Sequence, residues 1–474
     1  MISYPTITRI SLALCALLST GAQAQCDVPV ELGKLQPPGL IAHGNFGNAV
    51  AVHGDVAIIG GYRDTDNGDQ SGSAFIYRFD GSNWNYEQKL TASEGEPFDW
   101  FGYSVDIEGD TAIVGAPNSF GQAFQSGAVY IYEFSGTHWV ETQKLFPSEG
   151  VAGDNFGVSV SISASRMIIG ADQRDDLGFG SGAAYIYELD IIQWIQVAKL
   201  LNSTGAAADL FGSSVAISNM KAVVGSPGND LRGSWAGSAT AFETDGSTWT
   251  QYQTLAPIAL SAGDSFGTSV AIYDDNLVVG APFSDINGSD SGEVYTYSHS
   301  QLLGWFEWQP ALIPFDGAPD DWFGYSVAVT AGGTIAIGSM LDDDQGSATG
   351  SVYLYEPNLI FGWEFAHKVY ASDGAFGANF GESVDISGDS LLVGKPQAYD
   401  GASVTGAAYA YNLNPTISPC PPDLNTDCNL DFFDVSLFLT AFGNQDPIAD
   451  FSGDGLFDFF DVSAFLAAFG AGCP

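Results

Sequence analysis

Two segments near the C-terminus carry oxygen-bearing side chains at calcium-loop spacing. They begin at Asp423 and Asp450, 27 residues apart. Side-chain oxygens fall at positions 1, 3, 5, 9 and 12, contributed by Asp423, Asn425, Asp427, Asp431 and Asp434 in the first segment and by Asp450, Ser452, Asp454, Asp458 and Asp461 in the second. The backbone carbonyl at position 7, of Asn429 or Leu456, adds a ligand. Four carboxylates in one loop would repel one another without a cation, so the sequence predicts two Ca²⁺ sites.

Each segment runs into an apolar stripe with helical spacing, made by Val435, Phe438, Leu439 and Phe442 or by Val462, Phe465, Leu466 and Phe469. Two such helices can pack face to face. The duplicated loop and helix is similar to the dockerin family, which implies a small all-α calcium-binding domain at residues 423–474 that binds a protein partner on a scaffold or cell surface.

The chain departs from dockerins at two places. Dockerins often have small hydroxyl residues at loop positions 10 and 11, whereas this chain has Phe432-Phe433 and Phe459-Phe460. Cys428 also replaces the glycine expected at position 6 of the first loop. The resemblance therefore implies the calcium sites, while the partner is left open between a cohesin-like protein and another envelope component.

The longer part of the chain is organised by a repeat. Phe-Gly pairs recur at intervals of 55 or 57 residues, starting at Phe46, Phe101, Phe156, Phe211, Phe266, Phe323 and Phe380. Each unit predicts four short strands, for example over 104–107, 112–115, 128–132 and 139–145. Seven units of four strands predict an all-β, seven-bladed β-propeller over residues 25–411.

The last repeat lacks its fourth strand, because the pattern stops at Tyr411. A matching pair is found at the other end of the chain. Lys34-Leu35 stands twelve residues before Phe46, as Lys144-Leu145 stands before Phe156. The segment 27–36 is therefore expected to complete the seventh blade and to leave no long open sheet edge.

The repeat resembles the FG-GAP repeats of the integrin alpha-subunit head. The likeness rests on Phe-Gly, on triplets such as Gly115-Ala116-Pro117 and Gly280-Ala281-Pro282, and on runs such as Gly127-Ala128-Val129-Tyr130. It implies a propeller used for extracellular binding. The aspartate-rich calcium loop of that family is replaced here by short turns, so no propeller calcium site is implied.

Acidic residues gather instead in the loops between second and third strands, at 64–69, 284–290 and 342–344. Repeat folds often bind through such loops. Asp, Asn and Gly are also ordinary turn formers, so two interpretations of these loops stay open, a binding surface and simple turns.

Residues 1–24 are expected to form a secretory signal peptide, with Arg9, an apolar run from Ile10 to Leu18, and Ala22-Gln23-Ala24 as the cleavage site. No other run predicts a membrane span. The protein is thus expected to be secreted or displayed at the cell surface. A proline-rich linker is expected over 412–422. The formal net charge of −43 argues against nucleic acid and anionic lipid as partners.

Four cysteines follow the signal peptide, namely Cys26, Cys420, Cys428 and Cys473. An even number in an exported chain predicts two disulfides, and three pairings are open. Cys420 with Cys473 is favoured because these two residues bracket the C-terminal module. Cys26 would then pair with Cys428.

No catalytic constellation is identified. Gly263-Asp264-Ser265-Phe266-Gly267 matches the serine-hydrolase pattern, but Ser265 fills a slot that other repeats fill with unrelated residues such as Asn155 and Trp322. The expected function is a non-catalytic binding or adhesion propeller whose ligand is an extracellular protein or a polysaccharide. The alternatives are a polysaccharide-degrading component of a dockerin-assembled complex and a structural cell-surface spacer.

Overall fold

The structure is a computed structural model that describes residues 29–39, 43–358, 362–374, 376–400, 403–414, 422, 424 and 432–471. The chain divides into two units, one formed by Pro29–Leu413 and one that contains the described residues from Asn414 onward. The expected signal peptide at 1–24, the four cysteines and most of the expected linker lie outside the described residues.

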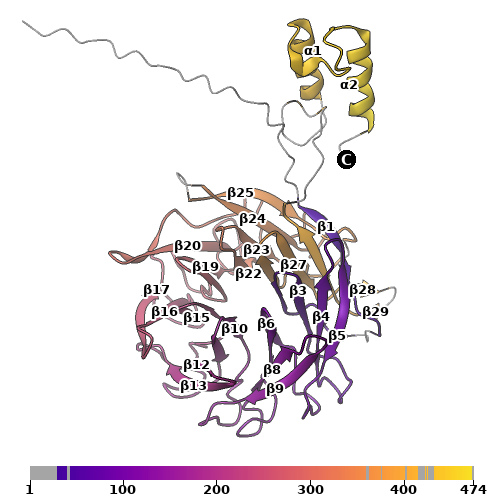
Figure 1. The fold of residues 1–474 in the computed structure, drawn as a ribbon. Helices are drawn as coiled ribbons and strands as arrows, with labels where there is room; N and C mark the ends of the chain where they lie inside the picture. The colour runs from indigo at the N-terminus through magenta and orange to yellow at the C-terminus, as the bar shows by residue number, and fades with distance from the viewer. Residues whose placement is uncertain are drawn as a thin grey trace, which may run out of the picture. The chain divides into compact units, whose positions relative to one another are not determined.

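Seven four-stranded antiparallel sheets form the first unit, within the part of the chain that the structure describes. Figure 1 shows them arranged in a ring as the blades of a propeller. Blade 1 contains β2 (Val50–His53), β3 (Val56–Gly61), β4 (Ser73–Phe79) and β5 (Trp84–Leu90); blade 2 contains β6 (Ser104–Glu108), β7 (Thr111–Ala116), β8 (Ala128–Phe134) and β9 (Trp139–Leu145); blade 3 contains β10 (Val160–Ser163), β11 (Arg166–Ala171), β12 (Ala183–Asp190) and β13 (Gln193–Leu200).

The remaining blades follow the same order. Blade 4 contains β14 (Val215–Ser218), β15 (Lys221–Ser226), β16 (Ser238–Thr244) and β17 (Trp249–Leu255); blade 5 contains β18 (Ser269–Tyr273), β19 (Asn276–Ala281), β20 (Glu293–Ser300) and β21 (Gly304–Glu307); blade 6 contains β22 (Phe323–Val329), β23 (Ile335–Ser339), β24 (Ser351–Asn358) and β25 (Gly362–Val369). Blade 7 contains β26 (Val384–Ser387), β27 (Ser390–Lys395), β30 (Ala407–Asn412) and β1 (Val30–Leu35), beside a small ribbon of β28 (Tyr399–Asp400) and β29 (Ser403–Val404). The expected seven-bladed propeller is confirmed.

The burial of each strand follows its place in the blade. The second strands are buried almost throughout, as in β3, because their continuous runs of Val, Ile, Ala and Gly meet neighbouring blades on both faces. The outermost strands, such as β9, alternate between buried and exposed side chains. The core therefore lies between the blades, where the fully buried Phe101 packs edge-on against Tyr130 with ring centroids 5.3 Å apart.

The glycine of the Phe-Gly pair stands where two blades meet. Gly102 has φ +87°, and a Cβ at this position would lie 2.2 Å from the carbonyl oxygen of Ser73 in blade 1. The carbonyl oxygen of Gly102 in turn lies only 2.1 Å from the place that a Cβ of Gly60 would take. The recurrence of Phe-Gly thus reflects a steric need at each joint between blades.

Blade 7 takes its outer strand from the N-terminal end of the chain. β1 pairs antiparallel with β30, and Lys34 and Leu35 face Tyr409 and Ala408. Polar contacts also connect β1 to the rest of the propeller. The Glu31 carboxylate accepts hydrogen bonds from the Ser372 backbone N–H (3.0 Å) and the Tyr411 hydroxyl (3.2 Å). Both ends of the propeller segment therefore share one sheet.

The second unit contains α1 (Phe432–Gly443), the 3₁₀ turn η1 (Pro447–Ala449) and α2 (Phe459–Ala471). Phe438 and Phe465 stack between the helices at 4.1 Å and 5°, and both are buried. The apolar stripes predicted for the two helices were wrong at Leu439 and Leu466. Both leucines are exposed, because phenylalanine rings fill the contact between the helices. No helix among the described residues is long and apolar enough to cross a membrane.

Candidate functional site

The propeller has one face made of irregular loops. In each up-and-down blade, the connection from the second to the third strand and the connection to the next blade emerge on the same side. We call this side the loop face. It carries exposed large apolar side chains, among them Phe98, Phe120, Phe124, Phe179, Trp235, Ile258, Phe315 and Phe376. The opposite side consists of shorter hairpins, so the variable surface of the propeller lies on the loop face.

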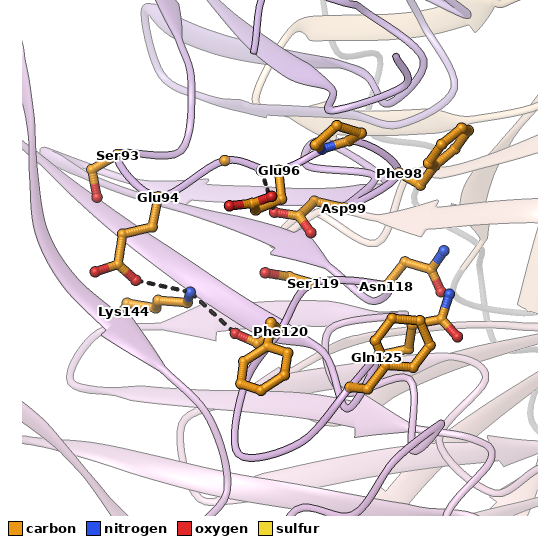
Figure 2. A pocket seen from close by; sticks show the side chains of 13 residues that line it. Ser93, Glu94, Glu96, Phe98, Asp99, Asn118, Ser119, Phe120, Gln125 and Lys144 are labelled. Carbon is orange, nitrogen blue, oxygen red and sulfur yellow. Dashed lines mark hydrogen bonds and ion pairs between the residues drawn. The ribbon is translucent and has the colours of Figure 1, made fainter. Parts of the chain in front are cut away.

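A pocket of about 1000 Å³ opens on the loop face of blade 2. It lies between the loop 91–103 that enters the blade and the loop 117–127 that joins β7 to β8 (Figure 2). We call it the blade-2 pocket. It is lined by Ser93, Glu94, Gly95, Glu96, Pro97, Phe98, Asp99, Asn118, Ser119, Phe120, Phe124, Gln125 and Lys144. Its volume lies at the upper end of the range for small-molecule sites.

Lys144 on β9 forms one wall of the pocket. Its ammonium group lies 5.2 Å from the ring centroid of Tyr130, and it donates long hydrogen bonds of 3.3 Å to Glu94 and to the carbonyl oxygen of Phe120 (Figure 2). The Glu94 side chain is 74% exposed. Because an exposed pair at this distance is weakly held, a ligand can compete for both groups.

Asp99 is a buried residue of the pocket lining. Its carboxylate accepts a hydrogen bond of 2.9 Å from the Glu96 backbone N–H. Burial raises the pKa of Asp99, and the nearby Ser119 and Lys144 only partly offset this effect. Asp99 can therefore act both as an acceptor and, once protonated, as a hydrogen-bond donor.

Pairs of stacked aromatic side chains lie beside the innermost strands of two blades. Trp100 stacks on Tyr103 at 6.1 Å, and Trp322 stacks on Tyr325 at 5.9 Å in the same positions of another blade. Burial raises the pKa of Tyr103, and Tyr62, Asp172 and Glu382 add to the shift. The Trp-Phe-Gly-Tyr strings at 100–103 and 322–325 are the sequence signal for these stacks, and sequence reasoning missed their pairing.

Two carboxylates of the innermost strands join neighbouring blades. Asp106 accepts a hydrogen bond of 2.7 Å from the backbone N–H of Ile162, and Asp385 accepts one of 2.7 Å from that of Val52. Burial raises the pKa of Asp106 to about 8, with a further contribution from Asp385, and burial raises that of Asp385 to about 7. These two carboxylates therefore have a structural role, since each bonds to the backbone of the next blade.

The second predicted calcium loop is described in full. At its start, the Asp450 carboxylate accepts hydrogen bonds from the backbone N–H groups of Gly453 (2.8 Å), Asp454 (3.2 Å) and Gly455 (2.9 Å). At its end, the buried Asp461 accepts from those of Ser452 and Asp458, both at 2.9 Å. These two bonds lower the pKa of Asp461 and keep the carboxylate charged.

The other predicted ligands of this loop lie between these two ends. Asp454 accepts from the Leu456 N–H (2.8 Å), and Asp458 accepts from the Phe460 N–H (2.8 Å). The predicted ligands of this loop are all hard oxygen donors, the type that Ca²⁺ prefers. Among the residues described, however, no three His, Cys, Asp or Glu side chains converge as a metal cluster, and the calcium ligand set stays a prediction.

Most of the first predicted loop lies outside the described residues, including Asp423, Asn425, Asp427, Asn429 and Asp431. Its last ligand, Asp434, is buried and accepts a hydrogen bond of 2.8 Å from the Leu424 N–H. The predicted disulfides also fall outside.

Residues 263–267 match the serine-hydrolase pattern in sequence. Within them, Ser265 has a left-handed backbone conformation (φ 52°) and precedes a strand, β18. Its hydroxyl donates to the carbonyl oxygen of Gly263 at 3.3 Å. The helix that follows the nucleophile in serine hydrolases of this pattern is replaced here by that strand.

Comparison with known proteins agrees with the repeat. A family model described as FG-GAP repeat matches seven segments, residues 30–77, 84–132, 139–187, 194–242, 249–297, 306–355 and 363–411. No curated protein matches the chain in sequence. A crystal structure of a protein from Lactobacillus plantarum is similar with a TM-score of 0.45 and 12% identity, over 69% of this chain and 86% of that one. Because the repeat model covers well over half of its length, the chain belongs to the FG-GAP repeat family.

Proposed function

We propose that this FG-GAP repeat protein is an exported, non-catalytic binding protein. Its propeller presents the loop face to an extracellular ligand, and its C-terminal unit is a calcium-binding, dockerin-like module that attaches it to a surface or scaffold partner. The observation that carries this proposal is the contrast between a scaffold that repeats seven times and a loop face that does not. Residues needed for folding recur in every blade, whereas the exposed aromatic residues of the loops differ between blades.

The calcium part of the proposal rests on the second loop. Ca²⁺ would be held by Asp450, Ser452, Asp454, Asp458 and Asp461 and the carbonyl of Leu456, and in the first loop by the corresponding residues from Asp423 to Asp434. A bound cation would neutralise the four carboxylates of this loop, whose hydrogen bonds in the structure come mainly from backbone N–H groups. The hydrogen bonds that Asp450 and Asp461 accept from the loop backbone support this assignment, because they fix the conformation of the loop at both ends.

The attachment part rests on the duplicated phenylalanines. Phe432, Phe433, Phe459 and Phe460 begin the two helices, and all four are exposed. Exposed aromatic residues repeated at equivalent positions suit an apolar protein surface rather than a polar one. We infer that the partner is a protein of the cell envelope or a cohesin-like scaffold that offers an apolar contact.

Calorimetry on the full chain tests the calcium sites. We expect two bound ions for the wild type and one for the double variant Asp450→Ala/Asp454→Ala. Asp446→Ala serves as the matched control, because Asp446 is an acidic residue of the same unit that caps η1 outside both loops. Binding of calcium by the double variant at wild-type stoichiometry would remove the ligand assignment.

Capture from an envelope fraction tests the attachment. The wild-type chain should retain a partner with calcium and release it with chelator. Replacing all four exposed phenylalanines by Ala should abolish capture, whereas Ile448→Ala, at another exposed apolar residue of this unit, should not. Equal capture by the two variants would show that the phenylalanines are not the contact.

A further inference from the structure

We propose that the blade-2 pocket binds a neutral oligosaccharide. The inference rests on the proposed function of the propeller as a binding module and adds the place and the ligand class. Three departures of blade 2 from its own repeat create the pocket, and the other blades serve as internal controls.

The first departure concerns the lysine of the fourth strand. In blade 1, Lys89 forms ion pairs of 2.6 Å with both Asp64 and Asp66. In blade 6, Lys368 pairs with Asp342 (2.7 Å) and Asp344 (2.6 Å). These acids come from the loop between the second and third strands, so they close the space over the lysine.

In blade 2 the same two loop positions hold Ser119 and Gly121. The small Ser119 side chain and the bare Gly121 leave the space open, so Lys144 has no close carboxylate partner from this loop. Its hydrogen bonds to Glu94 and to the carbonyl oxygen of Phe120 are both long, at 3.3 Å, and its ammonium group lies over the Tyr130 ring. An ammonium group that faces a cavity with weak partners can donate to a ligand oxygen.

The second departure is Phe120. Four other blades place an aspartate there, namely Asp175, Asp230, Asp285 and Asp343. The first three accept a hydrogen bond from the backbone N–H five residues later in their own loops, at Gly180, Trp235 and Asp290. Blade 2 replaces this loop-stabilising acid with an aromatic ring that is 60% exposed. Folding gains little from this exchange, so a surface role explains it better.

The third departure is Phe98, which has φ +70° and is 47% exposed. The same left-handed position holds His43, Gly153, Ala208, Gly263, Asp320 and Gly377 in the other blades. A bulky residue is strained in this region, whereas glycine is not. The strain places an aromatic ring at the rim of the pocket, opposite Phe120 (Figure 2).

The chemistry of the lining selects the ligand class. Glu94, Glu96 and Asp99 outnumber the single cation Lys144, and the chain carries a formal net charge of −43, so an anionic ligand is repelled. Asn118 and Gln125 add amides that both donate and accept. Hydroxyl groups can satisfy carboxylates, amides and the ammonium group at once, and aromatic rings at the rim suit the apolar C–H faces of a pyranose.

The test uses the full chain and a panel of neutral gluco-, manno- and xylo-oligosaccharides, with uronic-acid oligosaccharides for comparison. We expect at least one neutral series to bind and the uronic-acid series to bind more weakly. The double variant Phe98→Gly/Phe120→Asp restores the residues that other blades carry and should therefore fold, which its thermal unfolding midpoint verifies. It should lose about tenfold or more in affinity, which corresponds to about 1.4 kcal/mol. Phe179→Ala, at an exposed ring on the loop face of blade 3, should leave affinity unchanged.

Two results would overturn the proposal. One is wild-type affinity in the folded double variant, which would place any saccharide site elsewhere. The other is no binding of a neutral oligosaccharide, or tighter binding of the uronic-acid series. If calcium binding and chelator-sensitive capture persist in that case, the ligand class is wrong and the proposed function stands. Release of new reducing ends during incubation would instead overturn the non-catalytic function itself.

Discussion

The carboxylate of Asp106 on β6 accepts a hydrogen bond of 2.7 Å from the backbone N–H of Ile162 on β10, across the joint between blades 2 and 3. Asp385 makes the equivalent bond to Val52 between blades 7 and 1, and Ser161 makes it to Ile217 at 3.3 Å between blades 3 and 4. A polar side chain at this position therefore satisfies a backbone donor of the next blade. The aspartates carry an ionisable group where Ser161 carries none.

This difference predicts a pH dependence of stability. Burial raises the pKa of Asp106 to about 8 and that of Asp385 to about 7, whereas the pKa of an aspartate in the unfolded chain is about 3.9. The folded chain thus holds these protons more tightly than the unfolded chain. Their contribution to the free energy of unfolding is full below about pH 4 and is lost as the pH rises through about 7 to 8.

The variant Asp106→Ser copies Ser161 and should weaken this dependence. Between pH 6 and 8 the wild type should lose stability more steeply than the variant, by up to about 1.4 kcal/mol per pH unit for each proton. Chemical unfolding at a series of pH values measures the difference. Parallel curves for the two proteins would mean that Asp106 has an ordinary pKa.

The closure of the ring predicts unequal costs along β1. Leu35 is buried in a cluster with Phe46 and Ala408, whereas Val30 on the same strand is 43% exposed. Leu35→Ala should lower the free energy of unfolding by about 2–5 kcal/mol, and Val30→Ala by less than about 0.5 kcal/mol. Denaturant unfolding compares them, and equal effects would contradict a closure that depends on packing of β1.

The joints between blades also predict where a methyl group is not tolerated. A Cβ at Gly170 would lie 2.0 Å from the carbonyl oxygen of Gly212 and 2.3 Å from the Ser159 hydroxyl. Gly170→Ala should therefore cost about 3 kcal/mol or more, or prevent folding. Gly374→Ala is the control, because the nearest atom to its Cβ would be 3.9 Å away. A soluble Gly170→Ala protein with the wild-type unfolding midpoint would contradict this account of the Phe-Gly spacing.

The sequence could predict the scaffold because its constraints recur. The fully buried Phe101 and Phe156 occupy equivalent steric sites. The offset of Lys34-Leu35 predicted that the segment 27–36 completes the last blade, and in the structure β1 pairs with β30 of that blade. The calcium-loop spacing also repeats, at a 27-residue interval, and its ligand assignment stays a prediction. Repetition turns a weak local pattern into a strong one.

The blade-2 pocket was not predicted, although part of its signal was present. Comparing repeats would have shown that Ser119 stands where two blades have Asp64 and Asp342, and that Phe120 stands where four blades have aspartate. The left-handed backbone at Phe98 could not be predicted from this residue itself; its signal in the sequence is the glycine that other repeats have at this position, Gly153, Gly263 and Gly377. The bond from Ile162 to Asp106 spans 56 residues, and only the folded ring brings these residues together.

Outer-strand glutamines give a prediction that can raise stability as well as lower it. The side-chain amide of Gln143 on β9 donates to the carbonyl oxygen of Trp194 and accepts from its backbone N–H, both at 2.9 Å, and so joins blade 2 to blade 3. Gln88 makes the same pair of bonds to Trp139 at 2.9 and 2.8 Å. Blade 3 has Ala198 at this position, opposite Trp249 of blade 4.

Gln143→Ala should therefore destabilise the propeller by about 1–3 kcal/mol, because two backbone groups of Trp194 lose their partners. Ala198→Gln should stabilise it by about 0.5–1.5 kcal/mol, because the new amide can reach the backbone of Trp249. Denaturant midpoints of both single variants and of the double variant measure these effects. The two changes lie in different joints, so their effects should add; a destabilising Ala198→Gln would show that the joint between blades 3 and 4 has a different geometry.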